Sequence, residues 1–247
     1  MEYSRSSFIK KILISAGSLP VLVEACTKNS SASSTGSLSG SDSSSVSAST
    51  STDCVTTPTE VVGPYPYDLS KNSAIFRTDI TEDKTGIPLA VTFTLVNAND
   101  NCSVLEGARI DIWHCDKDGY YSEYNEPGYL GTEDNSGKTF LRGIQLSDSA
   151  GQVTFNTIYP GWYSGRVTHI HIEVFVDSVL KLASQVAFPD AVTTEVYNTS
   201  LYSPHGQNSI TNSSDQIFSD GYATELLTLT GDTTSGYTAA FKVGVPV

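Results

Sequence analysis

Alternating apolar and polar residues recur in short runs along most of the chain. In residues 89–96, for example, Val91, Phe93 and Leu95 alternate with threonines. Because successive side chains of a β-strand point to opposite faces, this pattern predicts a strand with one buried face. The same reasoning predicts strands in residues 108–115, 152–158, 169–176, 181–187, 225–230 and 237–243.

Turn-forming pairs separate these segments, among them Asp118-Gly119, Ala150-Gly151 and Pro160-Gly161. The helix that we expect is a turn or two at residues 190–197. Many short strands joined by Gly, Asp and Asn turns are typical of a sheet-on-sheet fold. We therefore predict an all-β protein, an antiparallel β-sandwich with little helix and with long loops that carry the active site.

The N-terminal part of the chain has a different pattern. Lys10 and Lys11 precede a short apolar stretch that ends at Cys26. This order is typical of an export signal, and the stretch is too short for a membrane span, which takes about 20 apolar residues. We interpret residues 1–26 as an export signal of lipoprotein type, residues 27–53 as a serine-rich disordered tether, and residues 54–247 as the folded domain.

The residues before Cys26 resemble the processing box of bacterial lipoproteins, with Glu24 as a departure. Lipidation of Cys26 would bind the protein to a membrane through this anchor alone. Cleavage without lipidation, followed by secretion, is the alternative. Both interpretations predict an exported protein, located as a cell-envelope lipoprotein or as a periplasmic or extracellular protein.

Net charge and cysteine content limit the possible partners and the disulfide bonds. The formal net charge is −13, so a basic face for nucleic acid is not expected. Outside the cytoplasm a disulfide is plausible. We expect Cys102 to pair with Cys115 and Cys54 to be left over, although spacing alone does not fix connectivity.

The sharpest chemical feature is His169-Ile170-His171 within a predicted strand. Residues i and i+2 of a strand share a face, so two imidazoles would project side by side, as a metal site requires. Taken alone, such a pair equally describes two histidines held by hydrogen bonds. Tyr163 lies on a loop only six residues earlier, after the Pro160-Gly161 turn, where it could reach a metal bound by the strand.

Several ordered motifs accompany this pair. They are Thr-Pro-x-x-x-x-Gly-Pro-Tyr at residues 57–65, Ile-Trp-x-Cys-Asp-x-x-Gly-x-Tyr at 112–121, Phe-Leu-Arg-Gly at 140–143, Asp-x-x-Gly at 148–151, Ile-x-Pro-Gly-x-Tyr at 158–163 and Arg-x-x-His-Ile-His at 166–171. Together they resemble the intradiol ring-cleavage dioxygenases, the group of protocatechuate 3,4-dioxygenase and catechol 1,2-dioxygenase. The resemblance covers about residues 54–190.

The resemblance implies a non-haem iron(III) cofactor with four protein ligands. Tyr121 and His169 match the equatorial ligands of the family, and Tyr163 and His171 match the axial ones. Tyr120 is the alternative to Tyr121, which is preferred because the family has Gly-x-Tyr at this point. Two phenolates suit ferric iron, because a bound cation lowers the pKa of a coordinated group.

The resemblance also implies the reaction. A catechol and dioxygen would react to give a cis,cis-muconate, with Tyr163 accepting a substrate proton and with Arg166 and Gln185 orienting the substrate. Tyr65 and Trp162 are expected to border the substrate pocket. Ser164-Gly165 replaces the Pro-Trp that protocatechuate enzymes commonly have after this tyrosine, which leaves the ring substituents of the substrate open. The exposed edges expected of the sheets, together with the oligomers common in the family, favour a homodimer.

Two other hypotheses are compatible with parts of the pattern. A cupin-like metal oxygenase also uses His-x-His, but it needs a later Glu and a further His, for which Glu173 and His205 are poorly placed. A surface-anchored β-sandwich without metal would act as a binding module. We expect His114 to be structural and His205 to lie in a loop.

Overall fold

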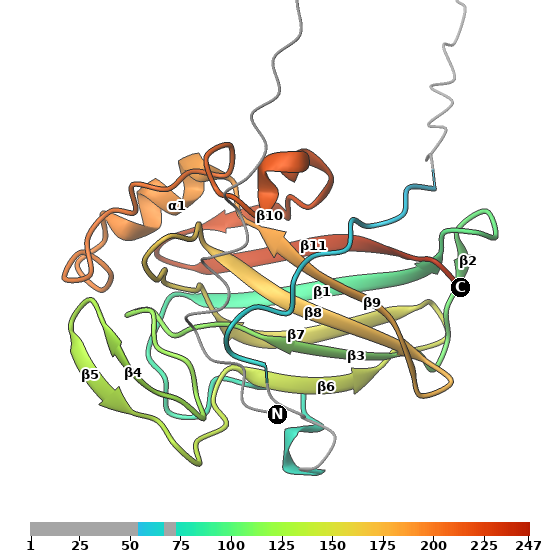
Figure 1. The fold of residues 1–247 in the computed structure, drawn as a ribbon, viewed down its shortest axis with the longest axis horizontal. Helices are drawn as coiled ribbons and strands as arrows, with labels where there is room; N and C mark the ends of the chain where they lie inside the picture. The colour runs from blue at the N-terminus through green and yellow to red at the C-terminus, as the bar shows by residue number, and fades with distance from the viewer. Residues whose placement is uncertain (1–53, 67–72) are drawn as a thin grey trace, which may run out of the picture. The chain divides into compact units, whose positions relative to one another are not determined.

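The structure is a computed structural model that describes residues 54–66 and 73–247. Two sheets enclose the main hydrophobic core (Figure 1). The first contains β10 (Thr228–Asp232), β11 (Gly236–Val245), β1 (Pro88–Asn97), β2 (Ser103–Val104) and β7 (Gln152–Ile158). The second contains β6 (Arg142–Leu146), β3 (Arg109–Trp113), β8 (His169–Val176) and β9 (Val179–Ala187).

The remaining elements lie in the loops. They are the hairpin β4 (Asn125–Gly128) and β5 (Gly131–Asp134), the helix α1 (Asp190–Tyr197), and the 3-10 turns η4 (Ser73–Ile75), η5 (Phe218–Asp220) and η6 (Tyr222–Thr224). Among the residues that the structure describes, no helix has the length and apolar character needed to cross a membrane.

The predicted β-sandwich is confirmed, and its core follows the alternation in the sequence. Val91, Phe93 and Leu95 of β1 are all buried, as are Ile170 and Ile172 of β8, and all five belong to one apolar cluster. One strand pair departs from the antiparallel pattern, because β1 and β11 run parallel. Parallel neighbours need a long connection, and here most of the domain lies between the two strands.

The strand registers place one row of residues across the outer face of the second sheet. Arg142 of β6 pairs with Trp113 of β3, Trp113 pairs with His171 of β8, and His171 pairs with Gln185 of β9. Directly opposed residues on neighbouring strands share a face. Since Ile170 and Ile172 face the core, this row faces away from it.

Residues 54–66, which we call the arm, cover part of this outer face. The arm is the blue segment that crosses β9 and β8 in Figure 1. The backbone N–H of Glu60 donates to the carbonyl of Ala183 on β9 at 2.9 Å, and the Gln185 amide donates to the Val61 carbonyl at 2.7 Å. The arm is therefore bonded to β9 where it crosses this strand, and it passes next to the row that contains His171.

The expected disulfide between Cys102 and Cys115 is wrong. Cys102 is bonded to Cys54 at the start of the arm, with the two Cα atoms 5.4 Å apart, and Cys115 is a buried free thiol. Strand β3 lies between Cys102 and Cys115 in the chain. The five extended residues of this strand span about 17 Å and separate Cys115 from Cys102. A disulfide allows a Cα–Cα distance of at most about 7 Å.

The interpretations of residues 1–26 as an export signal and of 27–53 as a tether lie outside the described residues.

Candidate metal centre

His169 and His171 project side by side from β8, and both side chains are buried. Their Nε2 atoms are 3.1 Å apart. Two nitrogens that each lie about 2.1 Å from one ion, at roughly a right angle, would be about 3.0 Å apart. The spacing of the two imidazoles therefore fits adjacent positions around a single metal ion.

The hydrogen bonds around the pair leave ring nitrogens for a ligand. The Nδ1–H of His169 donates to the Val167 carbonyl at 2.6 Å, which assigns a lone pair to Nε2 of the neutral ring. Within the described part of the chain, Nδ1 of His171 has no hydrogen-bond partner. Burial lowers the pKa of both histidines well below the usual value, so both rings stay neutral and able to coordinate.

Tyr163 reaches the histidine pair from the loop after β7. Its hydroxyl lies 3.4 Å from Nε2 of His169. The preceding Pro160-Gly161 turn packs on the loop after β3, where the Gly161 N–H donates to the Asp116 carbonyl at 3.0 Å. A Cβ on Gly161 would lie 2.4 Å from the Lys117 carbonyl oxygen, so only glycine lets the two loops approach this closely.

Tyr121 comes from that same loop after β3. Its ring contacts Tyr163 edge-on, with the centroids 5.7 Å apart, and stacks on Tyr65 of the arm at 4.4 Å. The hydroxyl of Tyr121 is buried and has no hydrogen-bond partner among the described residues. Tyr120 points elsewhere and donates its hydroxyl hydrogen to the Gly131 carbonyl of the β4–β5 hairpin at 3.1 Å.

Two arginines affect the pKa values of the two phenols. Burial raises the pKa of Tyr121 well above its usual value, and Arg166 and Arg142 counteract this effect. Burial likewise raises the pKa of Tyr163, with Arg166 again acting in the opposite direction. Buried phenols of this kind become ligands when a cation replaces their protons. Two imidazoles and two phenols are therefore a donor set that fits a hard, highly charged metal ion.

The arm closes over one side of this cluster at Gly63. With a φ of +80°, Gly63 adopts a backbone conformation that other residues rarely take. A Cβ at this position would lie 2.8 Å from Cε1 of His171. A glycine is required here because the backbone itself packs against the imidazole.

Arg166 and Gln185, predicted from the sequence to act beside the metal, contact each other. Arg166 Nη2 donates to Gln185 Oε1 at 2.6 Å, and Arg166 Nε donates to Asp215 Oδ2 at 2.9 Å. Asp215 is fully buried and also accepts the backbone N–H of Val167. Sequence reasoning missed Asp215, because a lone aspartate in a polar run of loop residues carries no recognisable signal.

Arg142 is a second functional candidate whose role the sequence did not reveal. It is fully buried, and Nε donates to the Ser122 hydroxyl at 2.8 Å. Both terminal nitrogens lie 3.2 Å from the Tyr65 carbonyl. Arg142 therefore connects the arm to the loop that carries Tyr121. The Phe-Leu-Arg-Gly motif marked this arginine but not its partners.

Trp162 lies on the side of the hairpin, where its ring contacts Tyr129 and His205. Its indole N–H donates to the Gly206 carbonyl at 3.0 Å. His205 is buried, and its Nε2 is 2.7 Å from the Trp162 carbonyl. His205 therefore lies beside Trp162 and the hairpin, where its Nδ1 has no hydrogen-bond partner among the described residues.

Comparison with known proteins supports this assembly. A family model described as dioxygenase matches residues 62–196, a little more than half of the chain. Catechol 1,2-dioxygenase 1 of Acinetobacter lwoffii is 24% identical over 148 residues, which make up 52% of this chain and 45% of that protein. Chlorocatechol 1,2-dioxygenase of Pseudomonas putida is 27% identical over 152 residues, 54% of each chain. The chain thus spans about half the length of the curated relatives it matches.

Solved structures match over a larger share of their length. An intradiol ring-cleavage dioxygenase from Tetranychus urticae has a TM-score of 0.69 at 27% identity, over 78% of this chain and 95% of that one. The dioxygenase domain of a carbohydrate-binding fusion protein from Streptomyces sp. SirexAA-E has a TM-score of 0.56 at 26% identity, over 78% and 99%. By its sequence motifs, its family match and its fold, the chain belongs to the intradiol ring-cleavage dioxygenase family.

Proposed function

We propose that this protein is a non-haem iron(III) enzyme that opens catechol-type rings with dioxygen to give cis,cis-muconate-type products. The observation that carries the proposal is the convergence of two imidazoles and two phenols. Nε2 of His169 lies 3.1 Å from Nε2 of His171 and 3.4 Å from the Tyr163 hydroxyl, and the Tyr121 ring contacts that of Tyr163. The catechol dioxygenases among its relatives support catechol as the substrate class.

Ferric iron, when bound by these four residues, would draw electron density from a catecholate and make its ring reactive toward dioxygen. The two tyrosines then have different tasks. Tyr121 is buried, whereas Tyr163 is only partly buried on its loop. Tyr163 is therefore the phenol that an incoming substrate meets, and its oxygen can accept a proton from a catechol hydroxyl.

Arg166 would stabilise negative charge on the phenolate and on the reacting ring. Its guanidinium is held by Asp215 and Gln185, at 2.9 Å and 2.6 Å respectively, so it does not need to reorganise during the reaction. Tyr65 adds an aromatic wall, because its ring stacks on Tyr121 and meets Tyr163 edge-on at 5.6 Å. Such a wall suits a planar aromatic substrate and limits water.

Two adjacent tyrosines provide a matched test. Iron-loaded protein should consume oxygen with catechols in a small panel, and its visible absorption should show tyrosinate-to-iron charge transfer. Tyr121→Phe should shift this band and lower the rate, because it removes one phenol from the cluster. Tyr120→Phe should leave both unchanged, since this hydroxyl bonds Gly131 instead. The proposal would be wrong if the folded, iron-loaded protein consumed no oxygen with any catechol.

We further propose that the protein is exported, as a cell-envelope lipoprotein or a secreted protein. The pattern around Lys10, Lys11 and Cys26 supports this proposal. Mass spectrometry of the mature N-terminal peptide would decide between the two forms. A lipid-sized mass on Cys26 supports the anchor, and an unmodified cleaved terminus supports secretion. An uncleaved Met1 on protein recovered from the cytoplasm would contradict export.

A further inference from the structure

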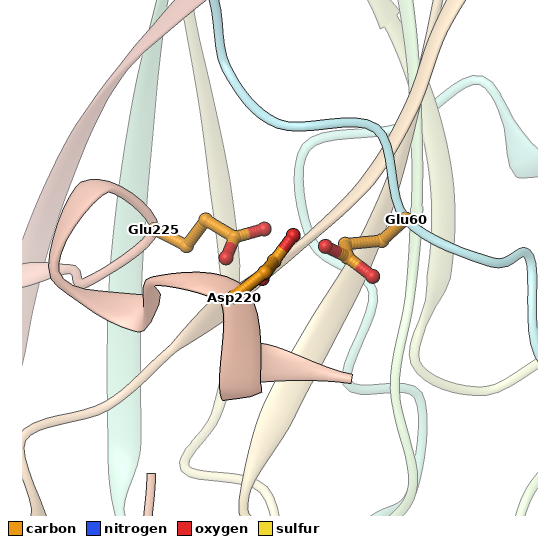
Figure 2. Close-up of side chains that lie close together, drawn as sticks. All are labelled: Glu60, Asp220 and Glu225. Atoms are coloured by element: carbon orange, nitrogen blue, oxygen red, sulfur yellow. The ribbon is translucent and has the colours of Figure 1, made fainter. Parts of the chain in front are cut away.

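Three carboxylates gather beside the candidate metal centre and are not used by the proposed reaction. They are Glu60 of the arm, Asp220 at the end of η5, and Glu225 just before β10. One oxygen from each can be chosen so that all three lie within 4.8 Å of one another. Figure 2 shows the three side chains pointing toward one another, Glu60 from the arm and both Asp220 and Glu225 from the loop before β10. All three residues lie outside the segment that the family model matches.

The buried position of Glu225 sets this cluster apart from ordinary surface acids. Its side chain is fully buried, and neither carboxylate oxygen has a hydrogen-bond partner in the described part of the chain. Glu60 is only 8% exposed, and its Oε1 also has no partner there. Buried carboxylates are costly unless they are paired or coordinate a metal. These two orphaned groups therefore indicate a missing positive partner.

The arginine whose charge acts on these carboxylates does not fill this role. Arg166 acts on the charge of both glutamates, but its guanidinium is already bound to Asp215 at 2.9 Å and to Gln185 at 2.6 Å. Burial, followed by repulsion from Asp220, raises the pKa of Glu60 to about 7. Burial, followed by repulsion from Glu60 and Asp220, raises the pKa of Glu225 to about 8. The cluster is thus short of positive charge even with Arg166 beside it.

We infer that Glu60, Asp220 and Glu225 bind a hard divalent cation of the size of calcium. An all-oxygen donor set excludes the softer metals that prefer nitrogen or sulfur. Calcium binds oxygens at about 2.3–2.6 Å, so ligands on opposite sides are about 4.8 Å apart. All three oxygens lie within this span of one another. Magnesium demands near-ideal octahedral geometry and keeps several of its waters, which suits a largely buried carboxylate cluster less well than calcium does.

Such an ion would join the arm to the loop that carries Asp220 and Glu225 before β10. The Glu60 N–H is bound to Ala183 of β9, and the Ala187 N–H of the same strand is bound to the Glu225 carbonyl at 2.9 Å. Gly63, which packs against His171, follows three residues after Glu60. The cation would therefore fix the segment that covers the histidine pair.

Calcium binding to the full chain tests this inference without any activity measurement. Protein freed of calcium with EGTA is titrated with CaCl2 by calorimetry, and with MgCl2 in parallel. One calcium should bind per chain, at least tenfold more tightly than magnesium. At a hundred times the Kd, the melting temperature should rise by about 5–10 °C. No binding of calcium up to about 10 mM, or equal binding of magnesium, would overturn the inference.

Variants locate the site. Glu225→Gln and Glu60→Gln should each weaken calcium binding at least tenfold, whereas Glu195→Gln, an equal charge change on the exposed surface of α1, should not. In EGTA at pH 9, above the pKa of about 8 of Glu225, Glu225→Gln should melt no lower than the parent, because one repelling buried charge is gone. If Glu225→Gln does not fold, Asp220→Asn changes an exposed ligand and should still weaken binding. Unchanged calcium affinity in the folded variants would refute the site.

Discussion

Buried histidines in two regions of this molecule have different surroundings. Between the sheets, His114 has Nδ1 2.8 Å from the Cys115 carbonyl and Nε2 2.7 Å from the Thr157 hydroxyl. On the outer face of the second sheet, Nδ1 of His171 has no partner among the described residues, and its Nε2 faces His169. Burial lowers the pKa of both His114 and His171, so neutrality does not distinguish them.

The two histidines differ in how many of their ring nitrogens have hydrogen-bond partners in the protein. Buried polar atoms are nearly always hydrogen-bonded, and an exception calls for an explanation such as an ion. His114 is saturated by protein groups and therefore acts as a structural residue. His171 keeps unsatisfied nitrogen and stacks on Trp113 at 4.9 Å, which fixes its orientation. A rigid, unsatisfied imidazole next to a second one is what distinguishes a ligand from a core histidine.

The strongest test of this contrast replaces one histidine from each region. His171→Ala should lose the metal and lower oxygen uptake with catechol by about a thousandfold or more, because metal assistance contributes several kcal/mol. His114→Ala should keep iron and activity in its folded fraction but lower the free energy of unfolding, since Thr157 loses a buried partner. Iron content and urea denaturation of both variants provide the measurements. Full iron and full activity in His171→Ala would refute the ligand assignment.

A second test compares the two faces of β8 itself. Ile172 faces the core next to His171, and its side chain is fully buried. Ile172→Ala should lower the free energy of unfolding by about 2–5 kcal/mol through the lost contacts and the cavity. Metal content per folded molecule should not change. A stability loss below about 1 kcal/mol in urea denaturation would contradict the position of this face in the core.

The core face could be predicted from the sequence, and much of the outer face could not. Alternation around Ile170 and Ile172 directly indicated a strand with one buried side. Strand β6 escaped prediction because its residues 142–146 include an arginine and a glycine and do not alternate. The hairpin β4–β5 escaped as well, since its side chains are largely exposed and show no apolar pattern.

The candidate site depended on contacts that are distant in the chain. His169 and His171 could be placed on one face because they share a strand, and ordered motifs led to Tyr121 and Tyr163. Asp215 could not be found, since its link to Arg166 depends on how a long loop returns to the sheet. The three-carboxylate cluster has the same origin, because Glu60 and Glu225 come from opposite ends of the domain. The hydrophobic periodicity of the sequence does not show which loop residues come back to contact the sheet.

Acid should destabilise the folded protein through the buried, neutral His114. Burial lowers its pKa from 6.5 to about 4, so the folded protein binds fewer protons than the unfolded chain between these values. Stability should therefore fall as the pH drops from 6.5 to about 4, by about 3 kcal/mol from this group. His114→Gln should show a flatter profile in urea denaturation across this range. Parallel profiles for both proteins would contradict a buried neutral His114.

The smallest expected effect concerns Asp215, which acts on the outer-face site through Arg166 and through the backbone N–H of Val167. Asp215→Asn keeps the size of the side chain but removes the charge that holds the guanidinium. We expect kcat for a catechol to fall about 10–100-fold, as for other supporting residues around metal sites, with KM and iron content little changed. A lower kcat at constant KM would indicate that Arg166 stabilises charge that develops during the reaction.

Asp148→Asn is the matched control for this last variant. Asp148 also accepts backbone N–H groups through its carboxylate, those of Ala150 and Gln152, but it lies in the turn before β7. The Asp148→Asn protein should lose stability without any change in kcat. If Asp215→Asn behaved in the same way, the aspartate would only support its loop, and Arg166 would reach its position without a charged partner. A selective fall in kcat would instead show that the outer face depends on residues well beyond the four proposed ligands.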